Sequence, residues 1–166
     1  MSEVSPVYES KIVHAGIFDF KTIYNFLYDL FTHYNYVVIE QKYSEKIKAE
    51  GKELEILWLC LRKINDYFRF RIKVRIFIVG MSSVEVVREN VKVKRDKGEI
   101  EVKIASYLEK DYENKWETNP VTKFLRGIYD KYIIKSTIEA YEDAVASEVD
   151  EILSQLKSYL ALEGRR

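Results

Sequence analysis

Few residues in this chain have the types and spacing that catalysis or metal binding requires. The two histidines, His14 and His33, fall on different predicted elements, and neither is spaced with the single cysteine, Cys60, as zinc ligands are. His14 could serve as a pocket base, but a lone histidine is more often structural. No serine lies in a G-x-S-x-G turn, and the six glycines form neither a phosphate loop nor a dinucleotide fingerprint. We therefore expect no catalytic residue, no metal site and no cofactor, and a binding protein is favoured over an enzyme.

One segment carries a row of cations. Between Phe68 and Ile78 every even position is apolar, and cations fill four odd positions: Arg69, Arg71, Lys73 and Arg75. A period of two indicates a β-strand with one buried and one wet face. The row could grip phosphates, but the simpler interpretation is a solvated sheet face with cross-strand carboxylate partners. The candidate partners are Glu53, Glu55, Glu99 and Glu101.

The segments around this strand predict the elements that position it. Val7 to Val13 is a short strand, and Asp19 can cap a helix whose apolar stripe runs from Phe20 to Tyr34. From residue 36 to 108, alternation and turn residues predict a five-strand meander, with turns at 49–52, 65–66, 80–83 and 95–98 and a β-bulge between 87 and 90. The strand 54–61 is apolar on both faces, so we expect it to be central in the sheet or covered twice.

The region from Asn119 to Leu162 has helical character. Asn119 and Pro120 have the types of an N-cap followed by the first helical residue. The apolar stripes of 121–132 and 138–159 point in different directions, so the region holds a kink or two helices. Ser136 begins a segment with the spacing of a capping box, which places the break just before it.

These elements predict a single α+β domain over residues 1–166, in which a curved antiparallel sheet packs on a long C-terminal helix. The order resembles the helix-grip fold of the START-type and pollen-allergen-like lipid-binding superfamily, over residues 7–160. The resemblance is one of element order and has no residue motif. The chain has one helix after the first strand where that family usually has two, five meander strands where it usually has six, and no glycine-rich loop around Gly51.

Composition limits the class of protein. Lys+Arg and Asp+Glu are both 27, so the formal net charge is zero, and a nonspecific nucleic-acid binder would carry a basic excess. The chain shows no signal peptide and no apolar run of membrane-spanning length, so we expect a cytoplasmic protein without a membrane span. Its Lys- and Glu-rich, glutamine-poor composition is typical of thermophiles. A homo-oligomer is compatible with the sequence.

Two functional hypotheses follow. The first is non-enzymatic binding of a small apolar or amphipathic molecule between the sheet and the C-terminal helix, which is also what the resemblance implies. The second is a protein–protein interaction module without a cavity, acting through a sheet edge or the helix 120–134. An enzyme resembling the polyketide cyclases of that fold is less favoured because acid–base candidates are sparse. Large side chains that would line the ligand site are Trp58, Phe70, Tyr107 and Tyr141.

Overall fold

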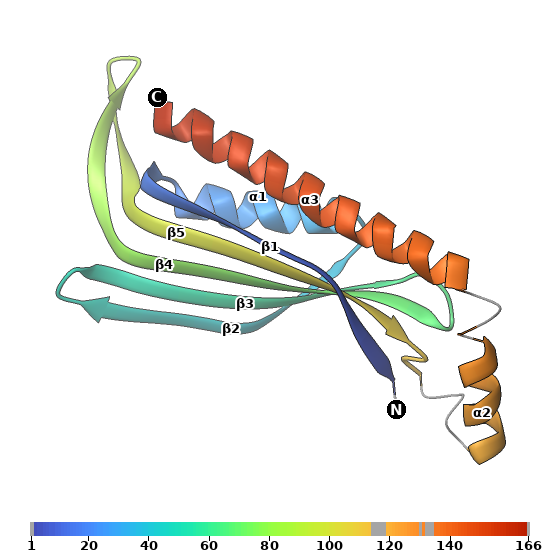
Figure 1. Ribbon diagram of the computed structural model, residues 1–166. Coiled ribbons are helices and arrows are strands. Elements are labelled where there is room, and N and C mark those ends of the chain that lie inside the picture. The colour runs from blue at the N-terminus through green and yellow to red at the C-terminus, as the bar shows by residue number, and fades with distance from the viewer. Residues whose placement is uncertain (1, 114–118, 130, 132–134, 166) are drawn as a thin grey trace.

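The computed structural model describes residues 2–113, 119–129, 131 and 135–165. Its elements are β1 Glu3–Phe18, α1 Phe20–His33, β2 Val37–Lys48, β3 Gly51–Lys63, β4 Phe68–Arg88, β5 Val91–Lys110, α2 Pro120–Ile128 and α3 Lys135–Arg165. Figure 1 shows α1 and α3 on one face of the sheet, while α2 stands at one end of the molecule.

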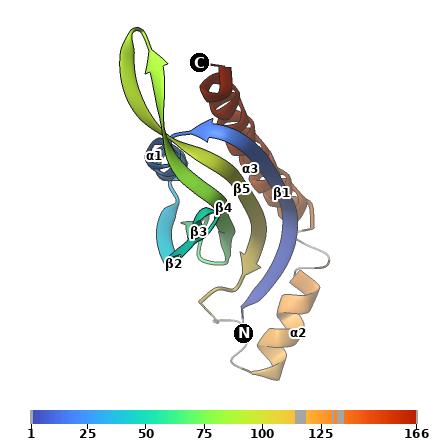
Figure 2. The ribbon, with the colours of Figure 1, turned by 90° about the vertical axis from the view of Figure 1, so that its left-hand side faces the viewer.

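The strands form one open antiparallel sheet in the order β1-β5-β4-β3-β2. The predicted class, an α+β fold with an antiparallel sheet packed on a C-terminal helix, is confirmed. Figure 2 shows the sheet from its end, strongly curved, with the β4–β5 hairpin extending beyond the other strands. β1 and β2 have one neighbour each and are the edge strands.

The prediction of five strands in the meander was wrong, because the meander contains four longer ones. The chain reverses at Glu89 and Asn90, whose φ angles are 49° and 64°, as a two-residue type I′ hairpin requires. The segment 95–98, predicted to be a hairpin turn, runs through β5, and the predicted turn at 80–83 is a bulge in β4. The parity change between 87 and 90 comes from the real turn. The turn-forming residues at 80–83 and 95–98 therefore lie at a bend in β4 and β5 and not at chain reversals.

Four glycines lie side by side across the sheet at this bend, and we call them the glycine line: Gly16, Gly51, Gly80 and Gly98. Gly16 pairs with Gly98 in the β1–β5 register. A Cβ at Gly98 would lie 2.9 Å from the Val79 carbonyl oxygen, and one at Gly51 would lie 2.8 Å from the Gly80 carbonyl carbon. Gly80 itself has a φ of 62°. Strands β3, β4 and β5 can therefore approach this closely only without side chains at these positions.

The even row of β4 is buried and forms the centre of the core, as its alternation predicts. Phe70, Ile72, Val74 and Ile76 are at most 2% exposed. They pack with buried side chains of α1 and α3, among them Leu27, Val149 and Ile152. The odd row therefore lies on the opposite face of the sheet.

The helix ends follow the sequence signals in part. Asn119 accepts a hydrogen bond from the Thr122 backbone N–H at 2.9 Å, and Pro120 is the first helical residue, so the predicted cap of α2 is confirmed. The prediction of two separate helices is also confirmed. Ser136 was predicted to be the cap of the second helix, but it lies inside α3, which begins by Lys135. The residue before Lys135 lies outside those described.

The glycine line gives a test of the bend. Gly98→Ala should lower the free energy of unfolding by about 1–3 kcal/mol, because its methyl group overpacks against the β4 backbone. Gly127→Ala is the matched control: a Cβ there meets no atom within 4 Å. In an exposed helix it should raise stability by about 0.4–1 kcal/mol. Urea unfolding of both variants measures the difference, and equal effects would contradict the steric role of Gly98.

Candidate functional site

The four side chains predicted to line one ligand site lie in three places. Phe70 of β4 and Tyr141 of α3 meet between sheet and helix, with ring centroids 6.3 Å apart. Trp58 packs against α1 on the same face, and its indole N–H donates to Glu40 at 3.1 Å. Tyr107 lies opposite Arg71 on the other face of the sheet. Only Phe70 and Tyr141 therefore come together.

Side chains fill the centre of the layer between the sheet and α3, and a recess of about 430 Å³ lies at its edge, between β1 and α3. Ile72 and Ile76 of β4, and Val149 and Ile152 of α3, have no exposed surface. A side chain next to a water-sized void would expose surface to it, so these four border none. A ligand site is therefore better supported on the surface of the molecule.

The face of the sheet that α1 and α3 do not cover, the outer face, carries an apolar patch. β3 presents half-exposed leucines there, and Val37 and Ile39 of β2 lie directly opposite two of them, 64% and 43% exposed. We call these five side chains the outer apolar patch: Val37, Ile39, Leu57, Leu59 and Leu61. No described helix lies over it (Figure 1). The strand 54–61 was predicted to be central or covered twice, and the first alternative holds: β3 lies between β4 and β2, while both covering helices lie on the inner face.

Two of the four cations in the odd row 69–75 of β4 are neutralised by carboxylates. Arg69 binds Glu109 at 2.7 Å, and Arg75 binds Glu55 at 2.7 Å. Of the carboxylates predicted to be partners, Glu55 therefore pairs with the row directly, and Glu101 lies 3.9 Å from Arg75. Hydrogen bonds from Lys42 and Arg75 lower the pKa of the Glu55 carboxyl, so it stays ionised at neutral pH.

The other two cations, Arg71 and Lys73, form no ion pair or hydrogen bond with any described residue. In the register they lie opposite Leu61 and Leu59 of the outer apolar patch. The Lys73 ammonium lies 5.4 Å from the centroid of the Tyr107 ring, which is within reach of a cation–π interaction. The outer face thus places two uncompensated positive charges beside uncovered apolar side chains.

A recess of about 330 Å³ opens on the outer face between these groups. Its floor includes Leu57, Ala105 and Tyr107, and Lys73 contributes positive charge to its wall, where Lys103 binds Glu9 at 3.0 Å. Trp58 also contributes to it, although its ring is buried on the inner side. This volume lies at the lower end of the range of about 300–1,000 Å³ for small-molecule sites. We call it the outer recess.

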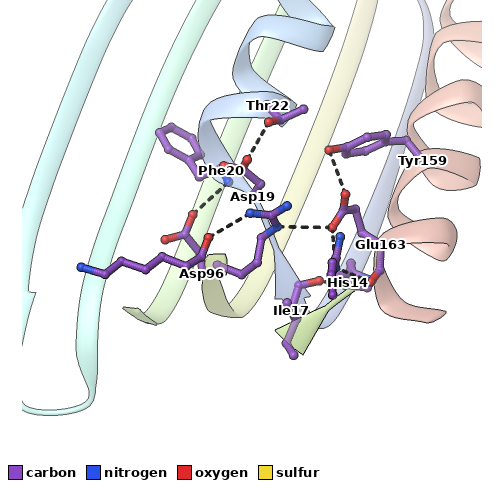
Figure 3. A network of polar contacts seen from close by, with 11 residues as sticks. His14, Ile17, Asp19, Phe20, Thr22, Asp96, Tyr159 and Glu163 are labelled. Carbon is purple, nitrogen blue, oxygen red and sulfur yellow. Dashed lines mark hydrogen bonds and ion pairs between the residues drawn. The ribbon is translucent and has the colours of Figure 1, made fainter. Parts of the chain in front are cut away.

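A polar cluster at the far end of the sheet was not predicted from the sequence (Figure 3). Arg88 and Arg95 from the β4–β5 hairpin both approach the Glu163 carboxylate of α3, at 3.1 and 3.9 Å. Tyr159 donates to the same carboxylate at 3.4 Å. These residues are far apart along the chain, so no spacing pattern could have indicated the cluster.

Two further contacts in the same view are structural. A ring nitrogen of His14 lies 3.3 Å from the Ile17 carbonyl oxygen, which agrees with a structural role for this histidine. The Phe20 backbone N–H at the start of α1 donates to Asp96 at 3.0 Å, so a carboxylate from β5 caps this helix.

Other classes of site find little support in the part of the chain that is described. No group of three His, Cys, Asp or Glu side chains there could hold a metal ion. Cys60 is buried, and burial raises the pKa of its thiol to about 12, so it is an inert side chain as predicted. None of the described helices combines the length and apolar composition of a membrane-spanning segment.

Comparisons of the chain with protein-family models, with curated proteins and with solved structures gave no match. The argument for function therefore depends on the geometry of the surface itself.

The outer apolar patch should contribute little to stability. Leu59→Thr places a β-branched side chain, which strands favour, at this position and should lower the free energy of unfolding by less than about 1 kcal/mol, because Leu59 is only partly buried. Ile72→Thr is the matched inner-face change and should cost more than about 2 kcal/mol, since it leaves a cavity and buries a hydroxyl. Guanidinium unfolding compares them. A similar loss in both would mean that Leu59 is a core residue.

Proposed function

We propose that this protein is a non-enzymatic binding protein whose ligand is a small amphipathic anion held on the outer face of the sheet. One observation carries the proposal: the outer apolar patch is uncovered and directly adjoins Arg71 and Lys73, which have no counter-ion among the described residues. Apolar surface of this kind favours contact with another apolar group. Unpaired cations beside it favour a ligand that also carries negative charge.

The arrangement suggests how such a ligand would lie. Its apolar body would contact Leu57 and Leu59 and enter the outer recess beside Tyr107. Its anionic group would accept hydrogen bonds from Lys73 or from the half-buried Arg71 guanidinium. Arg75 is already neutralised by Glu55, so it would form part of the recess wall without binding the anionic group.

This proposal keeps the ligand class of the first sequence hypothesis and changes its place. The helix-grip resemblance would put the ligand between the sheet and α3. The fully buried side chains of that layer support the outer face instead. The resemblance itself remains a proposal about ancestry and shape that rests on element order.

A second candidate function is protein–protein interaction, and α2 is the observation that favours it. Four apolar side chains of this short helix form one exposed stripe: Val121, Phe124, Leu125 and Ile128. Self-association through this stripe would be the simplest form of that function, and it would not involve the outer recess.

An anionic probe and its neutral analogue test the first proposal. The native protein should bind 1-anilinonaphthalene-8-sulfonate saturably with one-to-one stoichiometry, followed by fluorescence. The Arg71→Gln/Lys73→Gln variant should bind it roughly tenfold more weakly, because a hydrogen bond to a charged group contributes about 1.5–3 kcal/mol. Binding of N-phenyl-1-naphthylamine, which lacks the sulfonate, should change little in that variant and should weaken in Leu59→Thr.

Lys157→Gln removes an exposed lysine of α3 and is the control for a general charge effect. Sulfonate binding that is unsaturable, or that is equally affected by Lys157→Gln, would refute the outer-face site. Sedimentation velocity of the same samples measures self-association. A dimer that Phe124→Ser disrupts, with no probe binding to the outer face, would favour the interaction function.

A further inference from the structure

The β4–β5 hairpin forms a second recess beside the C-terminal end of α3, away from the outer face. Its volume is about 710 Å³, and its lining residues are Val87, Arg88, Glu89, Val91, Val93 and Arg95. Figures 1 and 2 both show the hairpin tip next to this end of α3. We call it the hairpin recess.

The two arginines of the hairpin recess share one carboxylate. Arg88 Nη2 and Arg95 Nε approach the same oxygen, Oε2 of Glu163, at 3.1 and 3.9 Å. The three side chains are only 16%, 19% and 13% exposed. Glu163 approaches the arginines from α3 and is not part of the recess lining, whose own carboxylate, Glu89, is exposed at the turn. Two partly desolvated guanidinium groups therefore face a single partly buried negative charge.

The hydrogen bonding of both arginines is incomplete. The Nε atoms of Arg88 and Arg95 are buried and have no acceptor among the described residues. The 3.9 Å separation between Arg95 Nε and Glu163 is too long for a hydrogen bond. Buried donors without partners are rare in folded proteins and call for an acceptor that the described part of the chain does not supply.

We infer that the hairpin recess is a binding site for a small oxyanion, a carboxylate or phosphate group, which takes the place of the Glu163 side chain. Replacement is required because both Nε atoms are closed to solvent, so an added ligand could not reach them while Glu163 occupies the site. A free oxyanion can face both guanidinium forks at once, whereas Glu163 approaches them with one oxygen. The three valines of the lining would contact an apolar substituent on the ligand.

Glu163 then acts as a tethered competitor for the two arginines. Its carboxylate joins the end of α3 to the hairpin, as Figure 3 shows, and ligand binding would break that connection. The alternative is a structural clasp, that is, a permanent ion pair between Glu163 and the two arginines with no ligand. The two differ in what happens when the carboxylate is removed and the arginines are kept.

Inorganic phosphate is the probe, and the arginine Nε–H signals in ¹H–¹⁵N NMR spectra are the readout. In the Glu163→Gln variant, phosphate should shift two of these signals saturably, with sodium chloride at equal ionic strength as the control for screening. The affinity should be roughly tenfold higher than in the wild-type protein, because an intramolecular competitor at millimolar effective concentration has been removed. Lys157→Gln, an exposed change on α3, should leave this titration unchanged. Phosphate should also raise the Tm of Glu163→Gln more than chloride does.

A structural clasp predicts the opposite pattern. Glu163→Gln would then be less stable, and its arginine signals would respond to phosphate and chloride alike, which would overturn the inference. Vesicles of phosphatidylglycerol separate the sources of the anion: co-sedimentation with vesicles without any phosphate-induced shift would overturn a site for a free anion. The site does not rest on the proposed outer-face function, because the Arg71→Gln/Lys73→Gln and Glu163→Gln variants test the two surfaces independently.

Discussion

The bend at the glycine line is the constraint on which the rest of the structure depends. β4 and β5 are the longest strands, with 21 and 20 residues, and the other strands of the sheet cannot pair with their whole length. Because Gly51 and Gly98 have no side chains, β3, β4 and β5 can approach closely there, and the bulge at Gly80 changes the direction of β4. The hairpin beyond the bend consequently reaches the end of α3. A side chain at Gly98 would therefore disturb the bend itself, and with it the position of the hairpin.

The two faces of β3 show how architecture and sequence disagree in this molecule. Its inner residues, such as Ile56 and Cys60, belong to the core, as the sheet requires. Its outer leucines have no covering layer, although a two-layer fold would normally place polar residues there. A conflict between local sequence and fold is expected at a functional surface, where stability is not the only requirement. This conflict, and not any motif, supports the outer face as the proposed binding surface.

Much of the fold could be predicted from local patterns, because those patterns report a local environment. The alternation from Phe68 to Ile78 fixed which side of β4 is buried, and Asn119 with Pro120 marked the start of α2. A hairpin turn was wrongly predicted at 95–98 because the same residue types occur where a strand bends and where the chain reverses. Only the pairing with the neighbouring strands distinguishes the two. Tyr107 could have been placed correctly: Val102 and Ile104 are buried, so an odd position on β5 faces outward. The pairing of Arg88 with Glu163 links positions 75 residues apart and leaves no trace in the sequence.

Zero net charge conceals an uneven distribution that bears on both proposed sites. α3 contains seven acidic and three basic residues, while β4 presents Arg71 and Lys73, which have no counter-ion among the described residues, on the opposite side of the sheet. The molecule is therefore polarised, with excess carboxylates on the helix and excess cations on the outer face. An approaching anion would be repelled from the helical side and attracted to the sheet, and this attraction would weaken with ionic strength.

At the hairpin recess the two distributions meet: the last described carboxylate of α3 is the one that neutralises the hairpin arginines in part. The balance of 27 cations and 27 carboxylates argues against a broad polyanion-binding surface, yet it is compatible with two small places where positive charge exceeds negative. Sites of that size suit a small anion better than a polymer.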